Sequence, residues 1–149
     1  MNLRRSHRLA AVMGAAVVVT AMTGTGIASA RTTDTLCGPE VELGSVVYKT
    51  CSDALSSPTT QYGTQQFIEA LNRGFGPTDI TVTLQHWDAA TSAWVTDATG
   101  ARTLAPGAST RYFNGPNFWP CGQDAQERTR AENTVGVGDW SEVTSPAPC

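Results

Sequence analysis

Catalytic chemistry in this chain would have to begin with one histidine and a few carboxylates. His86 is the single histidine after the first thirty residues, and Asp79, Asp88 and Asp97 lie near it in sequence. These residue types could serve a Ser-His-Asp triad or the carboxylate pair of a glycoside hydrolase. However, no Gly-x-Ser-x-Gly nucleophile motif is present. The pattern is typical of a structural histidine and turn-forming aspartates, so we predict no catalytic residue and a protein that is not an enzyme.

Metal and cofactor motifs are also missing from the sequence. The cysteines include no Cys-x-x-Cys pair, which is the spacing expected of a zinc site. The short Gly136–Gly138 segment does not match a phosphate-binding loop. We therefore predict no metal and no cofactor.

Aromatic residues give the stronger indication of a binding site. The chain has four tryptophans. Exposed tryptophans can anchor a protein partner or stack on a sugar, whereas Trp94 is expected to pack inside the protein. The candidate binding residues are therefore Phe118, Trp119, Trp140 and Trp87.

The first thirty residues have the three parts of a secretory signal peptide. Arg4, Arg5 and Arg8 form a basic start, Leu9–Val19 is an apolar run, and Ala28–Ala30 is a cleavage site of small residues. The apolar run is shorter than the roughly 18 residues that a membrane span requires. We predict a signal peptide over residues 1–30 and release of the mature protein outside the cell.

The mature chain, residues 31–149, has the length of a single domain and an acidic composition. Three of the ten Lys and Arg residues lie in the signal, and all thirteen Asp and Glu residues follow it, which leaves a net charge of about −6. Nucleic acids and anionic membranes bind basic surfaces, so both are excluded as partners. An extracellular protein is the expected partner, with a polysaccharide as the alternative.

Four cysteines remain in the mature chain, which is the even number expected of two disulfides in an exported protein. Three connectivities are open. We predict bonds Cys37–Cys51 and Cys121–Cys149, because each closes a short segment and the second ties down the final residue.

The central stretch reads as consecutive strands joined by turns. Apolar and polar residues alternate from Ile80 to His86, which predicts a strand with one buried face. Asp88–Ala93 forms a hairpin loop before Trp94, and Ala105–Gly107 suits a type II turn that leads into a strand over Ala108–Phe113. Gln66–Arg73 is also expected to be a strand, although its spacing leaves a helix open.

The flanking segments are expected to attach to this sheet. An extended arm over residues 31–44 precedes a strand at Ser45–Thr50, and a polar loop follows over Ser52–Gly63. Asn114–Gly122 is interpreted as a turn region. Asp124–Asn133 begins like a helix but has only two apolar residues, so a solvated loop or an edge strand is expected. Last short strands are expected over Thr134–Val137 and Trp140–Val143.

A family resemblance covers residues 72–109. It depends on an alternating strand, a hairpin tryptophan and a Leu-Ala-Pro-Gly turn, at positions Asn72, Gly74, Pro77, Val82–Leu84, Trp94 and Leu104–Ser109. This pattern resembles the immunoglobulin-like modules of exported bacterial proteins typified by the CARDB family. The resemblance implies an all-β fold, a small immunoglobulin-like antiparallel β-sandwich. It also implies an adhesion, spacer or recognition role without shared catalytic residues.

Taken together, the sequence predicts a secreted, non-catalytic protein-interaction module, either an adaptor subunit of an extracellular assembly or a recognition domain. One alternative is an inhibitor of an extracellular hydrolase that inserts a rigid loop at Phe118–Pro120. The other is a carbohydrate-binding module that uses surface tryptophans.

Overall fold

The computed structural model describes residues 34–55 and 61–146. The predicted signal peptide over residues 1–30 therefore lies outside the described residues, and so does Cys149. Within the described ranges, no helix is long and apolar enough to cross a membrane.

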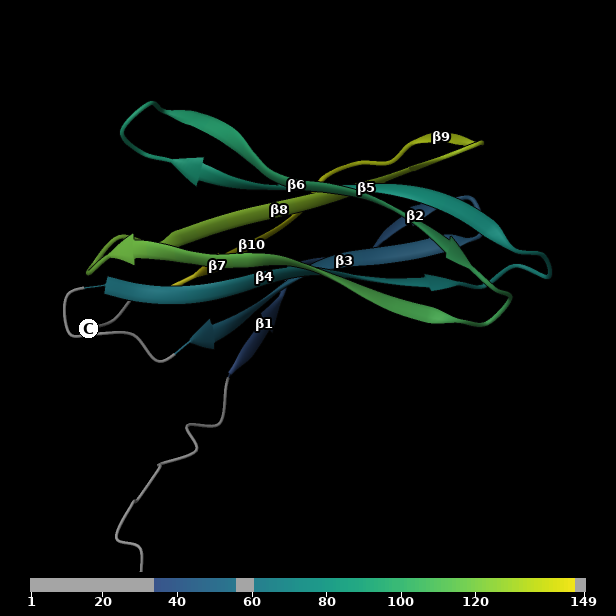
Figure 1. Ribbon diagram of the computed structural model, residues 1–149, viewed down its shortest axis with the longest axis horizontal. Helices are drawn as coiled ribbons and strands as arrows, with labels where there is room; N and C mark the ends of the chain where they lie inside the picture. Colours follow the sequence, from purple (N-terminus) through teal and green to yellow (C-terminus); the bar gives the residue numbers. More distant parts are fainter. Residues whose placement is uncertain (1–33, 56–60, 147–149) are drawn as a thin grey trace, which may run out of the picture. The chain divides into compact units, whose positions relative to one another are not determined.

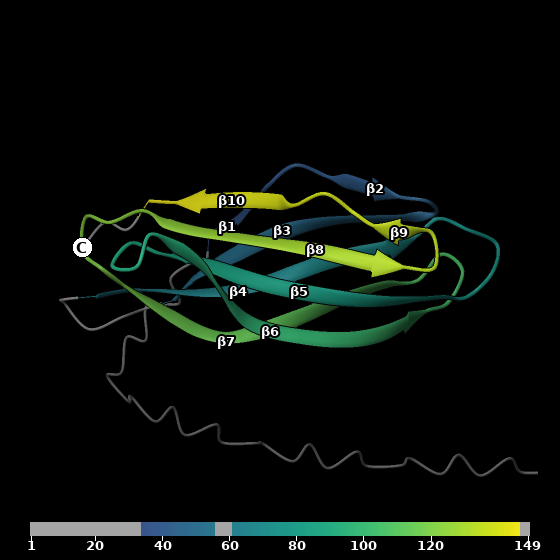
Figure 2. The same ribbon diagram turned by 90° about the horizontal axis from the view of Figure 1, so that it is seen from above.

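Two antiparallel sheets form two layers (Figure 1), and the view from above shows how their strands follow one another (Figure 2). The first sheet has the order β1-β3-β4-β7, with β2 also paired to β3: β1 (Thr35–Cys37), β2 (Val41–Leu43), β3 (Val46–Leu55), β4 (Gln61–Asn72) and β7 (Ser109–Pro120). The second has the order β10-β8-β5-β6, with β9 paired to β8: β5 (Thr78–Asp88), β6 (Ala93–Leu104), β8 (Ala125–Asn133), β9 (Gly136–Val137) and β10 (Ser141–Ser145). The predicted all-β class is confirmed.

The alternating segment in β5 places its apolar residues between the sheets, as predicted. Ile80, Val82 and Leu84 are buried, while their neighbours face outward. They pack on Ile68 of β4, which confirms a strand rather than a helix for Gln66–Arg73. Burial of these side chains is the main favourable term holding the layers together at this part of the core.

The turn between β6 and β7 has the geometry that its sequence predicts. Gly107 has a φ of 69°, and the backbone N–H of Ala108 donates to the carbonyl of Ala105 at 3.0 Å. A positive φ at the third position of a type II turn favours glycine, and proline suits the position before it. The Ala105–Pro106–Gly107 prediction is therefore confirmed.

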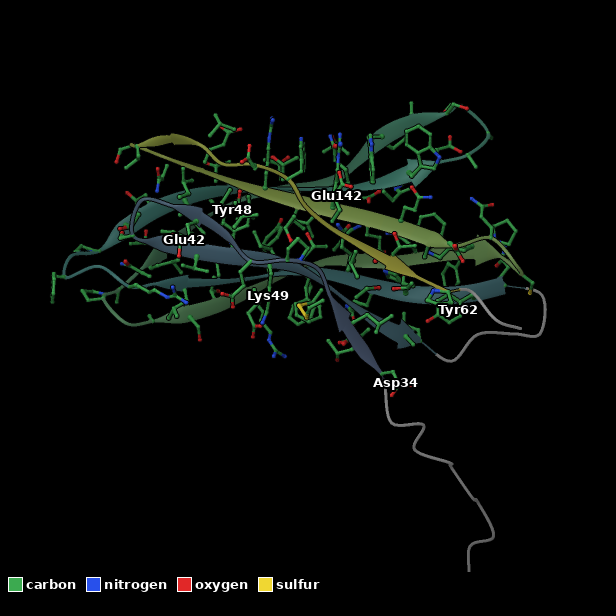
Figure 3. All side chains as sticks on the ribbon, turned by 180° about the vertical axis from the view of Figure 1, so that it is seen from behind. Asp34, Glu42, Tyr48, Lys49, Tyr62 and Glu142 are labelled. Atoms are coloured by element: carbon green, nitrogen blue, oxygen red, sulfur yellow. A yellow bond between two sulfur atoms is a disulfide. The ribbon has the colours of Figure 1, made fainter. Side chains whose placement is uncertain are left out.

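The expected N-terminal arm over residues 31–44 is part of the first sheet where it is described. It supplies β1 and β2, which both pair with β3. The predicted Cys37–Cys51 disulfide is present, with an S–S distance of 2.06 Å (Figure 3). The arm also contacts the second sheet, because the Ser141 hydroxyl donates to the carbonyl of Pro39 at 2.7 Å.

Two predicted irregular segments form strand instead. The loop expected over Ser52–Gly63 is mostly the end of β3 and the start of β4, with residues 56–60 outside the description. The turn region expected over Asn114–Gly122 is mostly the second half of β7. A bulge in the β4–β7 ladder between Gln65 and Phe67 absorbs the irregular sequence. The prolines of β7 are tolerated because this strand is at a sheet edge.

The segment Asp124–Asn133 was expected to be a solvated loop or an edge strand; a strand is correct, but its position at a sheet edge is wrong. Most of it forms β8, an interior strand paired to β5 on one side and β10 on the other. Burial alternates along β8, but hydrophobicity does not. The buried positions include Glu127 and Thr129 as well as Ala125 and Ala131. Hydrogen bonds across the sandwich replace the apolar stripe that the prediction required.

The two-disulfide prediction is confirmed for one bond only. Among the described residues the structure shows one disulfide, Cys37–Cys51. The proposed partner of Cys121 is outside the description, so the Cys121–Cys149 bond stays a prediction.

Gly38 marks a close approach between the arm and β10. A Cβ atom at this position would overlap the carbonyl oxygen of Glu142, whereas a Cβ at Gly115 would meet no atom within 4 Å. We expect Gly38→Ala to lower the free energy of unfolding by about 1–3 kcal/mol, the usual cost of overpacking. Urea denaturation should show a change of less than about 0.5 kcal/mol for the control, Gly115→Ala. Equal effects of the two substitutions would contradict this packing.

Candidate functional site

The interior of the sandwich is divided into an apolar part and a polar part. The apolar part includes Tyr48, Ile68 and Leu84 and continues to Leu104. The polar part consists of fully or almost fully buried hydroxyl, amide and carboxyl side chains: Thr50, Ser52, Thr64, Gln66, Glu127, Thr129, Ser141 and Ser145. Buried polar groups are costly unless they are hydrogen-bonded, so we take the polar part as the base of the candidate site.

Glu127 is the centre of this polar part. Its side chain comes from β8 and is 0 % exposed. Oε1 accepts hydrogen bonds from the Thr64 hydroxyl at 2.7 Å and from Asn117 Nδ2 at 3.3 Å. Burial raises the pKa of Glu127, while the side chains of Ser52, Thr64 and Asn117 oppose that rise. The carboxyl group therefore links β8 to β4 and β7 across the space between the sheets.

Trp119 and the Thr64 hydroxyl extend the same network. The indole Nε1–H of Trp119 donates to Thr64 Oγ1 at 3.0 Å, and Trp119 packs with Ala125 and Tyr62. Figure 3 labels Tyr62, which comes from the beginning of β4. With 4 % exposure, Trp119 is a core residue and not the surface anchor that the sequence suggested.

His86 and Asp97 form a pair beside this network. His86 Nδ1 lies 2.6 Å from Asp97 Oδ1, and the imidazole is edge-on to Trp119 at 5.7 Å between ring centres. Burial raises the pKa of Asp97, and His86 and Asn117 oppose the rise. When Asp97 is ionised, Nδ1–H donates to it and Nε2 is left for another partner. This pairing fixes the orientation of the His86 ring, and the structural role of the histidine stays a prediction.

A pocket of about 230 Å³ opens where the β5–β6 hairpin meets the end of β7. Both the hairpin and the turn after β7 lie at the left end of the sandwich in Figure 1 and Figure 2. The residues lining it include His86, Trp87, Asp88, Asn117, Phe118 and Trp119. The described residues include no cluster of three or more His, Cys, Asp or Glu that could hold a metal ion. The pocket can offer aromatic surface, one imidazole, the two amides of Asn117 and Gln123, and one rim carboxylate to a ligand.

A second aromatic group lies on the outer face of the β10-β8-β5-β6 sheet. The Arg128 guanidinium lies 4.0 Å from the ring centre of Trp94 and 4.1 Å from that of Trp140. Arg130 lies 4.7 Å from the Trp140 ring, and Trp87 is edge-on to Trp94 at 5.5 Å. We call these five residues the Trp-Arg stack. Each cation–π contact of this kind contributes about 0.5–1 kcal/mol at an exposed site.

Polar contacts fix the central arginine of the Trp-Arg stack. Arg128 Nε donates to Gln85 Oε1 at 2.9 Å, and Arg128 Nη1 pairs with Glu142 at 3.7 Å. Glu142, labelled in Figure 3, lies directly across from Arg128 in the β8–β10 ladder. These contacts restrain the Arg128 side chain in the absence of a partner.

The four candidate binding residues fall in different environments. Trp87 and Trp140 are partly buried members of the Trp-Arg stack, and Phe118 is 53 % exposed at the pocket. Trp119 contacts the pocket from the core. The structure thus brings Trp87, Phe118 and Trp119 together at one end of the sandwich and places Trp140 on the sheet face.

Sequence reasoning missed Glu127, Arg128 and Asn117. A usable signal was present over Ala125–Ala131, Ala-Gln-Glu-Arg-Thr-Arg-Ala, where small residues alternate with long polar ones at every position except Glu127. Strand periodicity puts Glu127 and Thr129 on the face of Ala125, and Arg128 on the opposite face. That periodicity does not reveal which residues pair with them across the sandwich.

Comparisons with known proteins give no family. No family model and no curated protein matches the chain. Among solved structures, it is similar to one described as an ApaA protein from Bordetella pertussis, with 17 % identity and a TM-score of 0.49 over 69 % of this chain and 94 % of that one. It is also similar to the structural-genomics target SoR45, with 13 % identity and a TM-score of 0.49 over 70 % and 88 %. Likenesses this distant carry no argument about function.

The raised pKa of Glu127 predicts a pH-dependent stability difference. A raised folded-state pKa favours the protonated form, so its contribution is complete below the usual carboxyl pKa and is lost as the pH rises through the folded value. Glu127→Gln keeps an acceptor for Thr64 and removes the buried charge. We expect the variant to be more stable than the wild type by about 1–3 kcal/mol at neutral pH, with the difference shrinking on acidification.

Melting temperatures of both proteins across this pH range test the expectation. Glu142→Gln, which alters an exposed carboxylate of the same sheet, is the control and should change little. A difference between Glu127→Gln and wild type that stays constant with pH would show that Glu127 does not titrate as proposed.

Proposed function

We propose that this protein is a secreted, non-catalytic recognition domain of immunoglobulin-like type that binds another extracellular protein through the Trp-Arg stack. The observation that carries the proposal is the placement of the Arg128 guanidinium between the rings of Trp94 and Trp140. The predicted signal peptide and the Cys37–Cys51 bond support an oxidising, extracellular location. The proposal includes the second disulfide, Cys121–Cys149.

The composition of the Trp-Arg stack favours a protein partner. Tryptophan and arginine are the residue types most enriched at the energetic centres of protein interfaces. Here the side chains are already ordered by mutual stacking and by the bond from Arg128 to Gln85. Binding would therefore cost less side-chain entropy than it would for unrestrained side chains, because these contacts already restrict the rotamers.

The same geometry disfavours sugar stacking at this surface. A sugar ring binds an aromatic residue through the open face of the ring. Arg128 and Arg130 both lie over Trp140, and Arg128 also lies over Trp94. Guanidinium groups therefore occupy ring faces that a polysaccharide would need.

The inhibitor alternative depended on a protruding loop at Phe118–Pro120. In the structure these residues belong to β7 and pair with β4, and Trp119 points into the core. A strand in that position has no free loop to insert into the active site of a hydrolase. No observation therefore favours the inhibitor over the recognition domain.

Binding measurements on the mature protein test the proposal. A partner captured from the culture medium would be purified and titrated by calorimetry against wild type, Trp140→Ala and Phe75→Ala. We expect Trp140→Ala to weaken binding at least about 30-fold, as for an interface hot spot of about 2 kcal/mol.

Phe75→Ala is the matched control because Phe75 is an aromatic residue that is fully exposed and outside the stack. Its affinity should equal that of wild type. If Trp140→Ala bound the partner as tightly as wild type, the Trp-Arg stack would not be the recognition surface. If the mature protein bound polysaccharides and no protein, the proposal of a protein partner would be wrong.

A further inference from the structure

The basic side chains of the described residues all have local partners away from the pocket. Each contacts a carboxylate or an aromatic ring: Lys49 and Arg111 on Glu69, Arg73 on Glu40 and Glu42, Arg102 on Tyr112, Arg128 on Glu142, and Arg130 on Glu132. None of them lines the pocket at the β5–β6 hairpin. These cations are thus engaged away from the pocket, five by carboxylates and Arg102 by the Tyr112 ring.

At the pocket end of the sandwich, acidic side chains outnumber basic ones among the described residues. Asp88 lies on its rim, and Asp97 and Glu127 lie behind His86 and Asn117. Asp88 accepts from the backbone N–H of Ala90 at 2.9 Å and from the Thr91 hydroxyl at 2.8 Å. These bonds lower the pKa of Asp88, so its charge is retained. Among the described residues, no lysine or arginine faces these three carboxyl groups.

Aromatic rings make up much of the remaining wall. Trp87, Phe118 and Trp119 line the pocket together with the ring of Pro120. A cation close to aromatic rings is attracted by their π electrons, and a carboxylate nearby adds to this attraction. The volume of about 230 Å³ is several times the ~30 Å³ occupied by a water molecule, so it can admit an alkyl chain with a charged end.

We propose that this pocket receives a lysine or arginine side chain of the extracellular protein partner. The inference rests on the proposed function for the class of partner, but the residues that carry it are separate from Arg128 and Trp140. The methylene groups of the incoming side chain would pack on Phe118 and Trp87. Its charged end would lie toward Asp88, with His86 Nε2 and the Asn117 amide as further polar neighbours. A partner that also covered the Trp-Arg stack would then make contact from the sheet face to the hairpin end.

Short peptides test the pocket without the rest of the partner. The probes are capped tripeptides Gly-X-Gly in which X is lysine, arginine, norleucine or glutamate, titrated into the nitrogen-15-labelled mature protein at low salt. We expect saturable shifts of the Trp87 and Trp119 indole N–H signals with lysine and arginine, at about millimolar affinity. The Trp140 indole signal, on the sheet face, should move much less.

Two aspartate variants supply the matched comparison. Asp88→Asn keeps an oxygen for the turn and removes the rim charge, so it should weaken lysine-peptide binding about three- to tenfold. Asp79→Asn removes an equal charge from the other end of β5, where Asp79 accepts from the Thr103 hydroxyl, and should leave the affinity unchanged. Dispersed spectra of both variants would establish that they are folded.

Several results would overturn the inference. Absence of any shift with the basic peptides would do so, and so would equal binding of the norleucine peptide, which would indicate an apolar pocket. If Asp79→Asn weakened lysine-peptide binding as much as Asp88→Asn, the effect would come from the overall charge and not from the pocket. Preferential shifts with methyl glycosides would identify a sugar pocket instead. None of these outcomes depends on the Trp140→Ala experiment, so failure of the pocket and failure of the Trp-Arg stack are distinguishable.

Discussion

The hydrogen bonds of β8 across the sandwich are the constraint on which the rest of the structure depends. Thr129 shares a hydrogen bond of 2.8 Å with Thr50, and Glu127 accepts from Thr64. A strand with so few apolar residues could not occupy the interior of a sheet without them. Once β8 is held there, its inward face closes the polar part of the core and its outward face presents Arg128 and Arg130. Interior chemistry and surface chemistry therefore come from the same nine residues.

The local sequence pattern predicted those elements whose conformation depends mainly on nearby residues. The alternation of β5 and the proline-glycine turn before β7 specify their conformations without help from distant residues. The interior position of β8 was not predictable in this way, since Thr64 and Thr50, the hydroxyl partners of Glu127 and Thr129, are 63 and 79 residues away in sequence. For the same reason the tryptophans could be named as candidate binding residues, but buried Trp119 could not be separated from partly exposed Trp140.

Two kinds of aromatic environment result from this arrangement, and they have different physical uses. In the Trp-Arg stack the rings are already engaged by cations, so the surface is rigid and offers ring edges and guanidinium groups. In the pocket the rings are accompanied by carboxyl groups and no cation among the described residues. The hairpin connects the two, because Trp87 lines the pocket and also touches Trp94 of the stack.

The Cys37–Cys51 bond joins two residues that lie directly opposite each other in the β1–β3 ladder. All three residues of β1 are exposed, so little apolar burial keeps this strand in place. If β1 detached, the backbone donors and acceptors of β3 from Cys51 to Asp53 would be uncovered and could pair with a strand of another molecule. The disulfide therefore keeps β1 paired with β3 and this edge of the sheet covered. If the disulfide were reduced, this edge of β3 would become open to intermolecular β-pairing while the core stayed buried.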